Sequence, residues 1–245
     1  MKIAKLVVAA AFAAITFAGV APAATAAPPA NPPSSDDVGI EIIGGGYATY
    51  APWAARMFYN GQQRCSATII APTYILSAQH CVAGLAASGL TFRIGSLDQF
   101  NGGTVARAVS YTTHSSADLA IVRLDRSVSA TYSPLGVSSN VFVGQTVQVY
   151  GWGATCTNQP EINCQSQRLK VANVIVTSVS CSDYRGGIAV CARYGNGIPA
   201  GGDSGGPMMA SGRQVGVAST SDRATRTAYT NITRYRSWIA SIAGV

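Results

Sequence analysis

Short runs in which apolar and polar residues alternate recur along the second half of the chain. Three examples are QTVQVYG (145–151), LKVANVIV (169–176) and RQVGVAS (213–219). A period of two is that of a strand with one buried and one solvated face. The chain also has 26 glycines and 11 prolines, with many short apolar runs between them. The pattern therefore predicts a turn-rich, mostly β protein.

The last segment follows a different period. In TNITRYRSWIASIAG (230–244) the apolar residues fall at helical spacing, and Thr230 or Asn231 precedes them as a candidate N-cap. These apolar positions are Ile232, Tyr235, Trp238, Ile239 and Ile242. We expect a terminal helix over about 230–244.

The beginning of the chain is typical of an exported protein. Two lysines precede an apolar, alanine-rich stretch (6–20), and APAATAA (21–27) offers a small-residue cleavage site. The apolar stretch is short for a membrane anchor, and no later span accompanies it. Residues 1–26 are therefore predicted to be a secretory signal. The proline-rich, polar segment 27–41 is predicted to be a pro-segment or linker.

The remainder of the chain carries 15 basic and 7 acidic residues, a net charge of +8. Such a charge would suit binding to nucleic acid or to an anionic surface, but the arginines are scattered, without a basic run or interleaved aromatic residues. A solvated cationic exterior is the better interpretation. The alanine-rich leader and the excess of arginine over lysine favour an exported bacterial protein.

Six cysteines, an even number, remain in this exported chain. No CxxC pair exists and only two histidines are present, so disulfides are favoured over metal sites, and no metal or cofactor is predicted. Fifteen pairings are formally open. The cysteines are Cys65, Cys81, Cys156, Cys164, Cys181 and Cys191.

The stretch AGGDSGGP (200–207) packs four glycines around Asp203 and Ser204. A serine hydroxyl is a poor nucleophile until a base removes its proton, and a neutral imidazole is the usual base. That imidazole in turn needs a carboxylate to fix its tautomer.

His80 and Asp118 are the candidates for these two partners. His80 ends a strand-like apolar run and adjoins Cys81, whereas His114 lies in a polar segment typical of an exposed loop. Asp118 stands directly before the apolar run of residues 119–124, where a buried charge would need a partner.

Six motifs occur in the order found in the chymotrypsin/trypsin-like serine proteases, which residues 42–245 resemble. They are IIGG (42–45), LSAQHC (76–81), DLAIVRL (118–124), GWG (151–153), GDSGGP (202–207) and RSWI (236–239). The resemblance implies an all-β fold of two six-stranded Greek-key β-barrels, roughly 42–140 and 141–228, with the site between them. The terminal helix would then pack on the second barrel.

By this resemblance Ser204 is the nucleophile, His80 the general base and acid, and Asp118 the orienting carboxylate. The N–H groups of Gly202 and Ser204 would form the oxyanion hole. The chain order His, Asp, Ser differs from the order Ser, Asp, His of the α/β-hydrolases, which excludes an esterase or lipase of that class.

The resemblance also implies a zymogen. Cleavage before Ile42 would create an α-ammonium group that pairs with Asp203. Glu41 precedes this bond where many relatives carry a basic residue, so activation by a glutamate-directed protease or by self-cleavage is expected. Ile43 as the new terminus is the weaker alternative.

The substrate pocket departs from the trypsin pattern. Six residues before the nucleophile, Ile198 replaces the aspartate that selects Arg or Lys, and an apolar base offers no counter-charge. The β-branched Thr227 would narrow the pocket. We therefore expect a preference for small or medium apolar residues at the cleavage point. The expected pocket residues are Ile198, Pro199, Ala200, Ser219, Thr220, Ser221 and Thr227.

Two cysteine pairs match family bridges, Cys65 with Cys81 and Cys181 with Cys191, while Cys156 and Cys164 most simply pair locally. The expected partners are protein or peptide substrates and an activating protease. We expect a secreted monomer that binds no nucleic acid and, once the signal is removed, no membrane. The alternative is a catalytically silent homologue that serves as an extracellular binding module, although every triad residue is retained.

Overall fold

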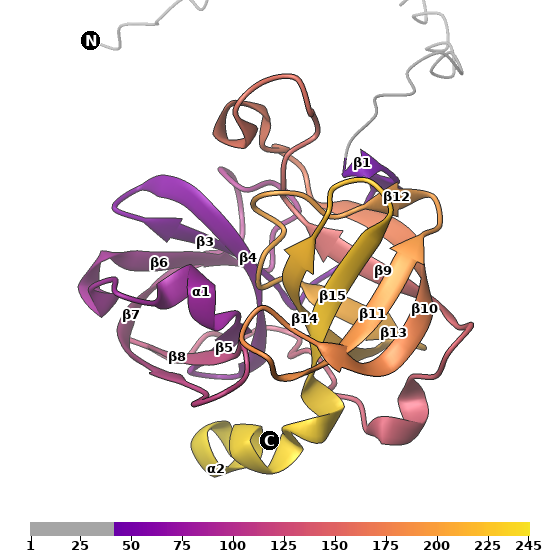
Figure 1. Ribbon diagram of the computed structural model, residues 1–245. Coiled ribbons are helices and arrows are strands. Elements are labelled where there is room, and N and C mark those ends of the chain that lie inside the picture. Colours follow the sequence, from indigo (N-terminus) through magenta and orange to yellow (C-terminus); the bar gives the residue numbers. More distant parts are fainter. Residues whose placement is uncertain (1–41) are drawn as a thin grey trace, which may run out of the picture. The chain divides into compact units, whose positions relative to one another are not determined.

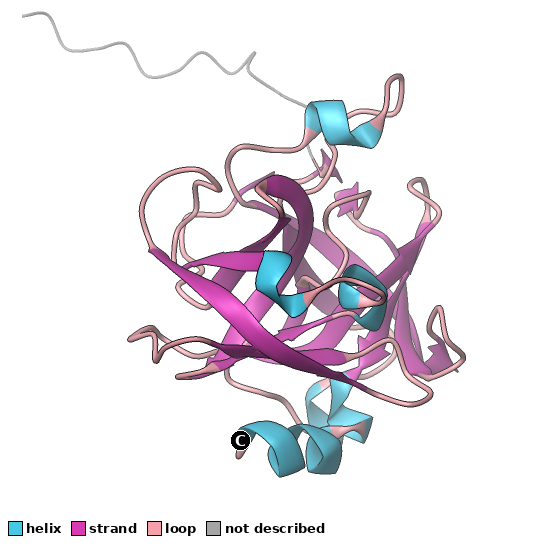
Figure 2. Cartoon of the chain, turned by 90° about the vertical axis from the view of Figure 1, so that its left-hand side faces the viewer, coloured by secondary structure: helices cyan, strands magenta, loops and turns pink. Residues whose placement is uncertain are grey.

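The computed structural model describes residues 42–245, and the predicted signal (1–26) and pro-segment (27–41) lie outside them. Strands dominate the described chain and the helices are short (Figure 2). Within these residues no helix is both long and apolar enough to cross a membrane.

Six antiparallel strands close into a first barrel, in the order β3-β4-β5-β8-β7-β6 (Figure 1). Side chains alternate between buried and part-exposed positions along β6, as expected for strands that enclose a core. The strands are β3 (Ala54–Tyr59), β4 (Gln62–Ala71), β5 (Tyr74–Ser77), β6 (Leu90–Ile94), β7 (Thr104–Thr113) and β8 (Ala120–Leu124).

A second antiparallel barrel follows in the order β11-β15-β14-β13-β9-β10, closed by the pairing of β10 with β11. Short β2 (Gly46–Tyr47) adds to β10. The strands are β9 (Thr146–Gly151), β10 (Lys170–Ser182), β11 (Ile188–Tyr194), β13 (Pro207–Ala210), β14 (Arg213–Ser221) and β15 (Arg226–Asn231). Since β9, β10 and β14 coincide with the three alternating runs of the sequence, the predicted all-β fold is confirmed.

Outside the barrels, β1 (Ile43–Gly44) pairs with β12 (Gly197–Ile198), and the helical segments are short. They are α1 (Gln79–Val82), α2 (Arg236–Ala243) and the 3-10 turns η1 (Ala87–Gly89), η2 (Ser138–Asn140), η3 (Glu161–Cys164) and η4 (Ile232–Arg234).

The terminal helix differs from the prediction in its start and in its packing. Thr230 and Asn231 still belong to β15, and Asn231 accepts a hydrogen bond from the amide of Thr233 at the start of η4. Helix α2 packs against β8 of the first barrel, and its buried Ile239 belongs to the adjoining core. The half-buried His114 ring also packs against two aromatic rings: its centroid lies 4.9 Å from that of Tyr235 and 5.2 Å from that of Trp238.

Two hydrophobic cores, rich in aliphatic side chains, fill the barrels. The first contains Met57, Ile69, Leu76, Phe92 and Val122, and the second contains Val149, Val174, Val190, Met208 and Tyr229. Interdigitated apolar side chains fix the relative positions of the strand ends. The loops between strands therefore leave the barrels at defined places.

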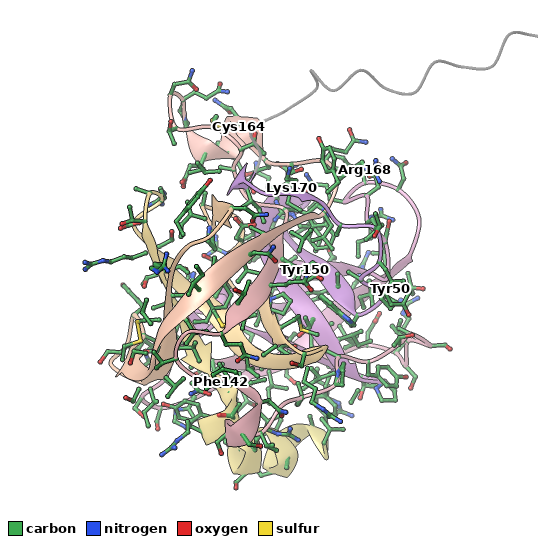
Figure 3. All side chains as sticks on the ribbon, turned by 90° about the vertical axis from the view of Figure 1, so that its right-hand side faces the viewer. Tyr50, Phe142, Tyr150, Cys164, Arg168 and Lys170 are labelled. Carbon is green, nitrogen blue, oxygen red and sulfur yellow. A yellow bond between two sulfur atoms is a disulfide. The ribbon has the colours of Figure 1, made fainter. Side chains whose placement is uncertain are left out.

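Three disulfides tie these loops, and they join the expected pairs: Cys65 with Cys81, Cys156 with Cys164 and Cys181 with Cys191. Cys164 lies on a loop that stands out from the barrels (Figure 3).

Candidate active site

His80 and Asp118 are joined by two hydrogen bonds. His80 lies in α1, which one residue separates from β5, and Asp118 lies two residues before β8, the strand that pairs with β5. His80 Nδ1 lies 2.7 Å from Asp118 Oδ2, and the backbone amide of His80 donates to Asp118 Oδ1 at 3.0 Å. The Cys65–Cys81 disulfide anchors the turn that carries the imidazole. The carboxylate therefore fixes Nδ1 as the protonated nitrogen of the neutral ring and leaves Nε2 as the base.

Asp118 is fully buried and accepts a third hydrogen bond, from Ser219 Oγ at 2.6 Å. Its own backbone amide donates to Oδ2 of the buried Asp183 at 2.8 Å. Burial raises the pKa of Asp118, but the hydrogen bonds and charge of His80, together with the Ser219 bond, outweigh it and hold that pKa below its ordinary value. The carboxylate is therefore ionised at neutral pH.

Ser204 lines a cavity of about 210 Å³ on the second barrel. The backbone carbonyl of Ser204 accepts a hydrogen bond from the amide of Ser66 at 2.9 Å. Ser66 follows Cys65, whose disulfide partner Cys81 is next to His80. Within residues 42–245 the Ser204 hydroxyl forms no hydrogen bond. The structure thus joins His80 to Asp118 and leaves the Ser204 hydroxyl without a bond to either.

Gly202 has a φ of +100°, a conformation that favours glycine. A Cβ at this position would also overlap the side-chain amide of Gln165. The amides of Gly202 and Ser204 donate to no acceptor within the described residues. Two backbone donors of this loop are therefore free to bind a ligand.

Asp203 is buried beneath this loop. Its Oδ1 accepts from the Gly153 amide at 2.7 Å, and its Oδ2 accepts from the Ala200 amide at 2.9 Å. Burial raises the pKa of Asp203 to about 6, against these hydrogen bonds and the positive charge of Arg56. Ile42 is buried in the core of the second barrel, and no ion pair joins it to Asp203 in the described chain.

The cavity is lined mainly by small residues and hydroxyl groups, and it contains six of the seven expected pocket residues. Ile198 is the exception, because it lies in β12, where it pairs with Ile43, and its buried side chain is not part of the lining. The lining comprises Pro199, Ala200, Gly201, Ser204, Ala218, Ser219, Thr220, Ser221, Arg223 and Thr227.

Sequence reasoning did not find five residues that shape this region. Asp183 supports Asp118, and the buried Arg56 contacts the Gly202 carbonyl. Gln165 and Glu161 contact Gly201 from the side of the Cys156–Cys164 loop, and Arg223 pairs with Glu161. Only Asp183 had a local signal, its position between Cys181 and Cys191. The other four residues come to the site from distant parts of the sequence, which no motif connects.

The chain belongs to the trypsin family, whose family model, described as "Trypsin", matches residues 42–239. It is 30% identical over 223 residues to trypsin alpha of Drosophila melanogaster, covering 82% of this chain and 87% of that protein. This insect relative gives no support to the bacterial source expected from composition.

Two solved structures share the fold. A mutant of human heparin binding protein (CAP37) superposes with a TM-score of 0.72 at 24% identity, covering 82% of this chain and 96% of that one. The scabies mite inactivated protease paralogue S-D1 superposes with a TM-score of 0.72 at 20% identity, covering 82% and 97%. This fold thus occurs in at least one protein described as inactivated.

Proposed function

We propose that this protein is a secreted serine endopeptidase that cleaves peptide bonds through a covalent acyl-enzyme. The main support is the His80–Asp118 pair, in which a buried carboxylate orients an imidazole that is 28% exposed. A buried carboxylate that holds a partly exposed imidazole in one orientation is the arrangement that a general base requires. The membership of the trypsin family points to the same activity.

In the proposed mechanism, His80 Nε2 takes the proton of Ser204 as Oγ attacks the substrate carbonyl. The resulting imidazolium is stabilised by Asp118, and His80 then returns the proton to the leaving amine. The oxyanion accepts hydrogen bonds from the amides of Gly202 and Ser204, each donor contributing about 2.7–4 kcal/mol to the transition state. A catalytic serine and histidine often approach closely only with substrate bound, so the unbonded Ser204 hydroxyl is compatible with this role.

Activation proceeds by cleavage before Ile42. In the uncleaved chain Ile42 has a φ of +37°, a region that β-branched residues avoid. Hydrolysis removes the preceding carbonyl with which such a residue clashes, and it creates an α-ammonium group. This ammonium pairs with Asp203, whose charge is otherwise costly to bury. Glu41 at the cut implies a protease that accepts an acidic residue, or the enzyme itself.

The substrate preference follows from the cavity. Its volume is about 210 Å³, and none of the described residues that line it carries a carboxylate. A Lys or Arg side chain would therefore be desolvated without a counter-charge. The buried Thr227 limits the depth available, so small or medium apolar side chains at the cleavage point are the preferred substrates.

A serine-directed peptide phosphonate with alanine or valine at the reactive position tests the activity directly. The secreted, processed protein, acting as a monomer, is expected to be labelled at Ser204 and to cleave peptides with the matching residue. The Ser204→Ala variant should do neither. A processed protein that is folded but not labelled would instead be a catalytically silent homologue with a binding role. The mite paralogue is one protein of this fold that is described as inactivated.

A further inference from the structure

Arg56 is a fully buried cation in the middle of β3. Its guanidinium donates to three acceptors, all of them neutral: Gln99 Oε1 at 2.9 Å, Gln165 Oε1 at 2.9 Å and the Gly202 carbonyl at 3.1 Å. Burial lowers the pKa of Arg56 to about 9, while the negative charge of Asp203 opposes that change. Arg56 is therefore charged at neutral pH, and its contacts are directed at the loop that carries Ser204.

The first peptide group that Arg56 holds lies between Gly202 and Asp203. The Gly202 carbonyl accepts from Arg56 Nη1 and also from Ser66 Oγ at 2.9 Å. Because a trans peptide is planar, the Asp203 N–H points the opposite way, and it donates to the Ala200 carbonyl at 3.1 Å. This peptide plane is thus held on both sides.

The second peptide group lies between Gly201 and Gly202 and is reached through Gln165. A guanidinium can only donate, so Arg56 requires the oxygen of the Gln165 amide to face it. The nitrogen of that amide then faces the Gly201 carbonyl and donates to it at 2.8 Å, beside the amide of Ala154 at 2.8 Å. Because the Gly201 carbonyl is fixed, the Gly202 N–H must point away from it.

We propose that Arg56 is a positioning residue that orients both peptide groups flanking Gly202 and so aims the Gly202 N–H at the reaction site. An arginine suits this task because its guanidinium is planar and carries several N–H donors, which contact Gly202 and Gln165 together. The inference rests on the proposed protease function, in which the Gly202 N–H stabilises the oxyanion. Arg56 itself touches no reacting atom.

The first test compares Arg56→Met with Arg236→Met in the processed enzyme. Arg236 also donates to a backbone carbonyl, that of Gly136, but from α2, outside the site. For Arg56→Met we expect kcat to fall roughly ten- to hundredfold, less than the ~10²–10³-fold loss of a whole oxyanion donor, with KM within about threefold. Arg236→Met should retain both constants.

A ligand pair separates orientation from general damage to the fold. A peptide aldehyde adds to Ser204 and places an oxyanion in the hole, whereas the carboxylate product of the same peptide only occupies the cavity. In Arg56→Met the aldehyde affinity should fall in parallel with kcat/KM, while the product affinity should stay the same. An equal loss of both affinities would overturn the proposal.

Gln165→Glu serves as the second variant, in case Arg56→Met does not fold. It keeps the size of the side chain and its contact with Arg56, but it removes the N–H that holds the Gly201 carbonyl. We expect at least a roughly tenfold loss of kcat with KM little changed, by the same loss of orientation.

The two hypotheses fail in different ways. A wild-type protein that neither reacts with the phosphonate nor cleaves peptides would refute the protease function. An active wild type with folded Arg56→Met or Gln165→Glu variants that keep kcat within about threefold would refute only the role of Arg56.

Discussion

The hydroxyl of Ser219 donates at 2.6 Å to Oδ2 of Asp118, the same oxygen that contacts the imidazole of His80. Ser219 belongs to β14 of the second barrel, whereas Asp118 lies two residues before β8 of the first. The bond therefore crosses between the barrels at the point where the proposed triad requires a fixed carboxylate. Ser219 also lines the cavity, so it connects the proposed substrate pocket with Asp118.

Replacing Ser219 by alanine should weaken catalysis and stability together. The buried carboxylate loses one hydrogen bond, which costs about 1–3 kcal/mol of unfolding free energy, and kcat/KM should fall roughly tenfold because Asp118 is held less firmly against His80. The pKa of Asp118 should rise, because the Ser219 bond helps to lower it.

Ser133→Ala is the matched control, since Ser133 is also buried and bonds a side chain, Gln214, at 2.8 Å. Denaturant unfolding and steady-state kinetics give the two measurements. Equal activity of the two variants would contradict the link between Ser219 and Asp118.

Asp203 should make the uncleaved precursor less stable as the pH rises. Its folded pKa of about 6 exceeds the ordinary 3.8, so its contribution to stability is fully present below pH 3.8 and is lost as the pH rises through about 6. The loss corresponds to about 3 kcal/mol. Urea unfolding of the Ser204→Ala precursor between pH 4 and 7 measures it.

Asp203→Asn in the same precursor should remove that part of the pH dependence, because an amide does not titrate. Besides Arg56, the charge of Glu161 acts on Asp203, and both are present in the two precursors. Superimposable pH profiles with and without Asp203 would show that this carboxyl does not titrate in the expected range.

Thr227→Gly should shift the substrate preference toward larger side chains. Thr227 is buried, lines the cavity and donates to the Thr220 carbonyl at 2.8 Å. Removing its side chain enlarges the cavity, so the ratio of kcat/KM for a phenylalanine substrate to that for an alanine substrate should rise roughly tenfold or more. Thr227→Ser, which keeps the hydroxyl, should change the ratio much less. An unchanged ratio in both variants would place the substrate side chain elsewhere.

Replacing Cys156 and Cys164 together by serine should destabilise the protein and loosen the loop beside Gly201. The bridge closes a loop with a sequence separation of 8, worth roughly 2–3 kcal/mol on the chain-entropy estimate. This corresponds to a lowering of Tm by roughly 5–10 °C. Glu161 lies inside this loop and accepts from the Gly201 amide at 3.1 Å, so kcat should also fall several-fold. An unchanged Tm in calorimetry would show that the bridge restricts the unfolded chain little.

The alternating runs of the sequence predicted β9, β10 and β14, because burial of one strand face leaves a local signature. The terminal helix was predicted too, but its start was placed too early. Thr230 is buried and donates to Asp183 at 2.8 Å, which holds that residue in β15. The packing of the terminal helix against the first barrel could not be predicted from its helical spacing, because that spacing shows an apolar face but not the surface that covers it.

The sequence by itself determined the strand-forming runs and, through the family resemblance of its motifs, pointed to His80, Asp118 and Ser204 as candidate catalytic residues. For the cysteines, the resemblance implied two of the three disulfides, and proximity along the chain suggested the third, between Cys156 and Cys164. Only the tertiary structure decided that Ile198 pairs with Ile43 outside the cavity lining, and that Arg56 reaches Gly202 across a separation of 146 residues. The reason is physical: a residue's periodicity reports its local burial, whereas its partner depends on how the two barrels pack against each other.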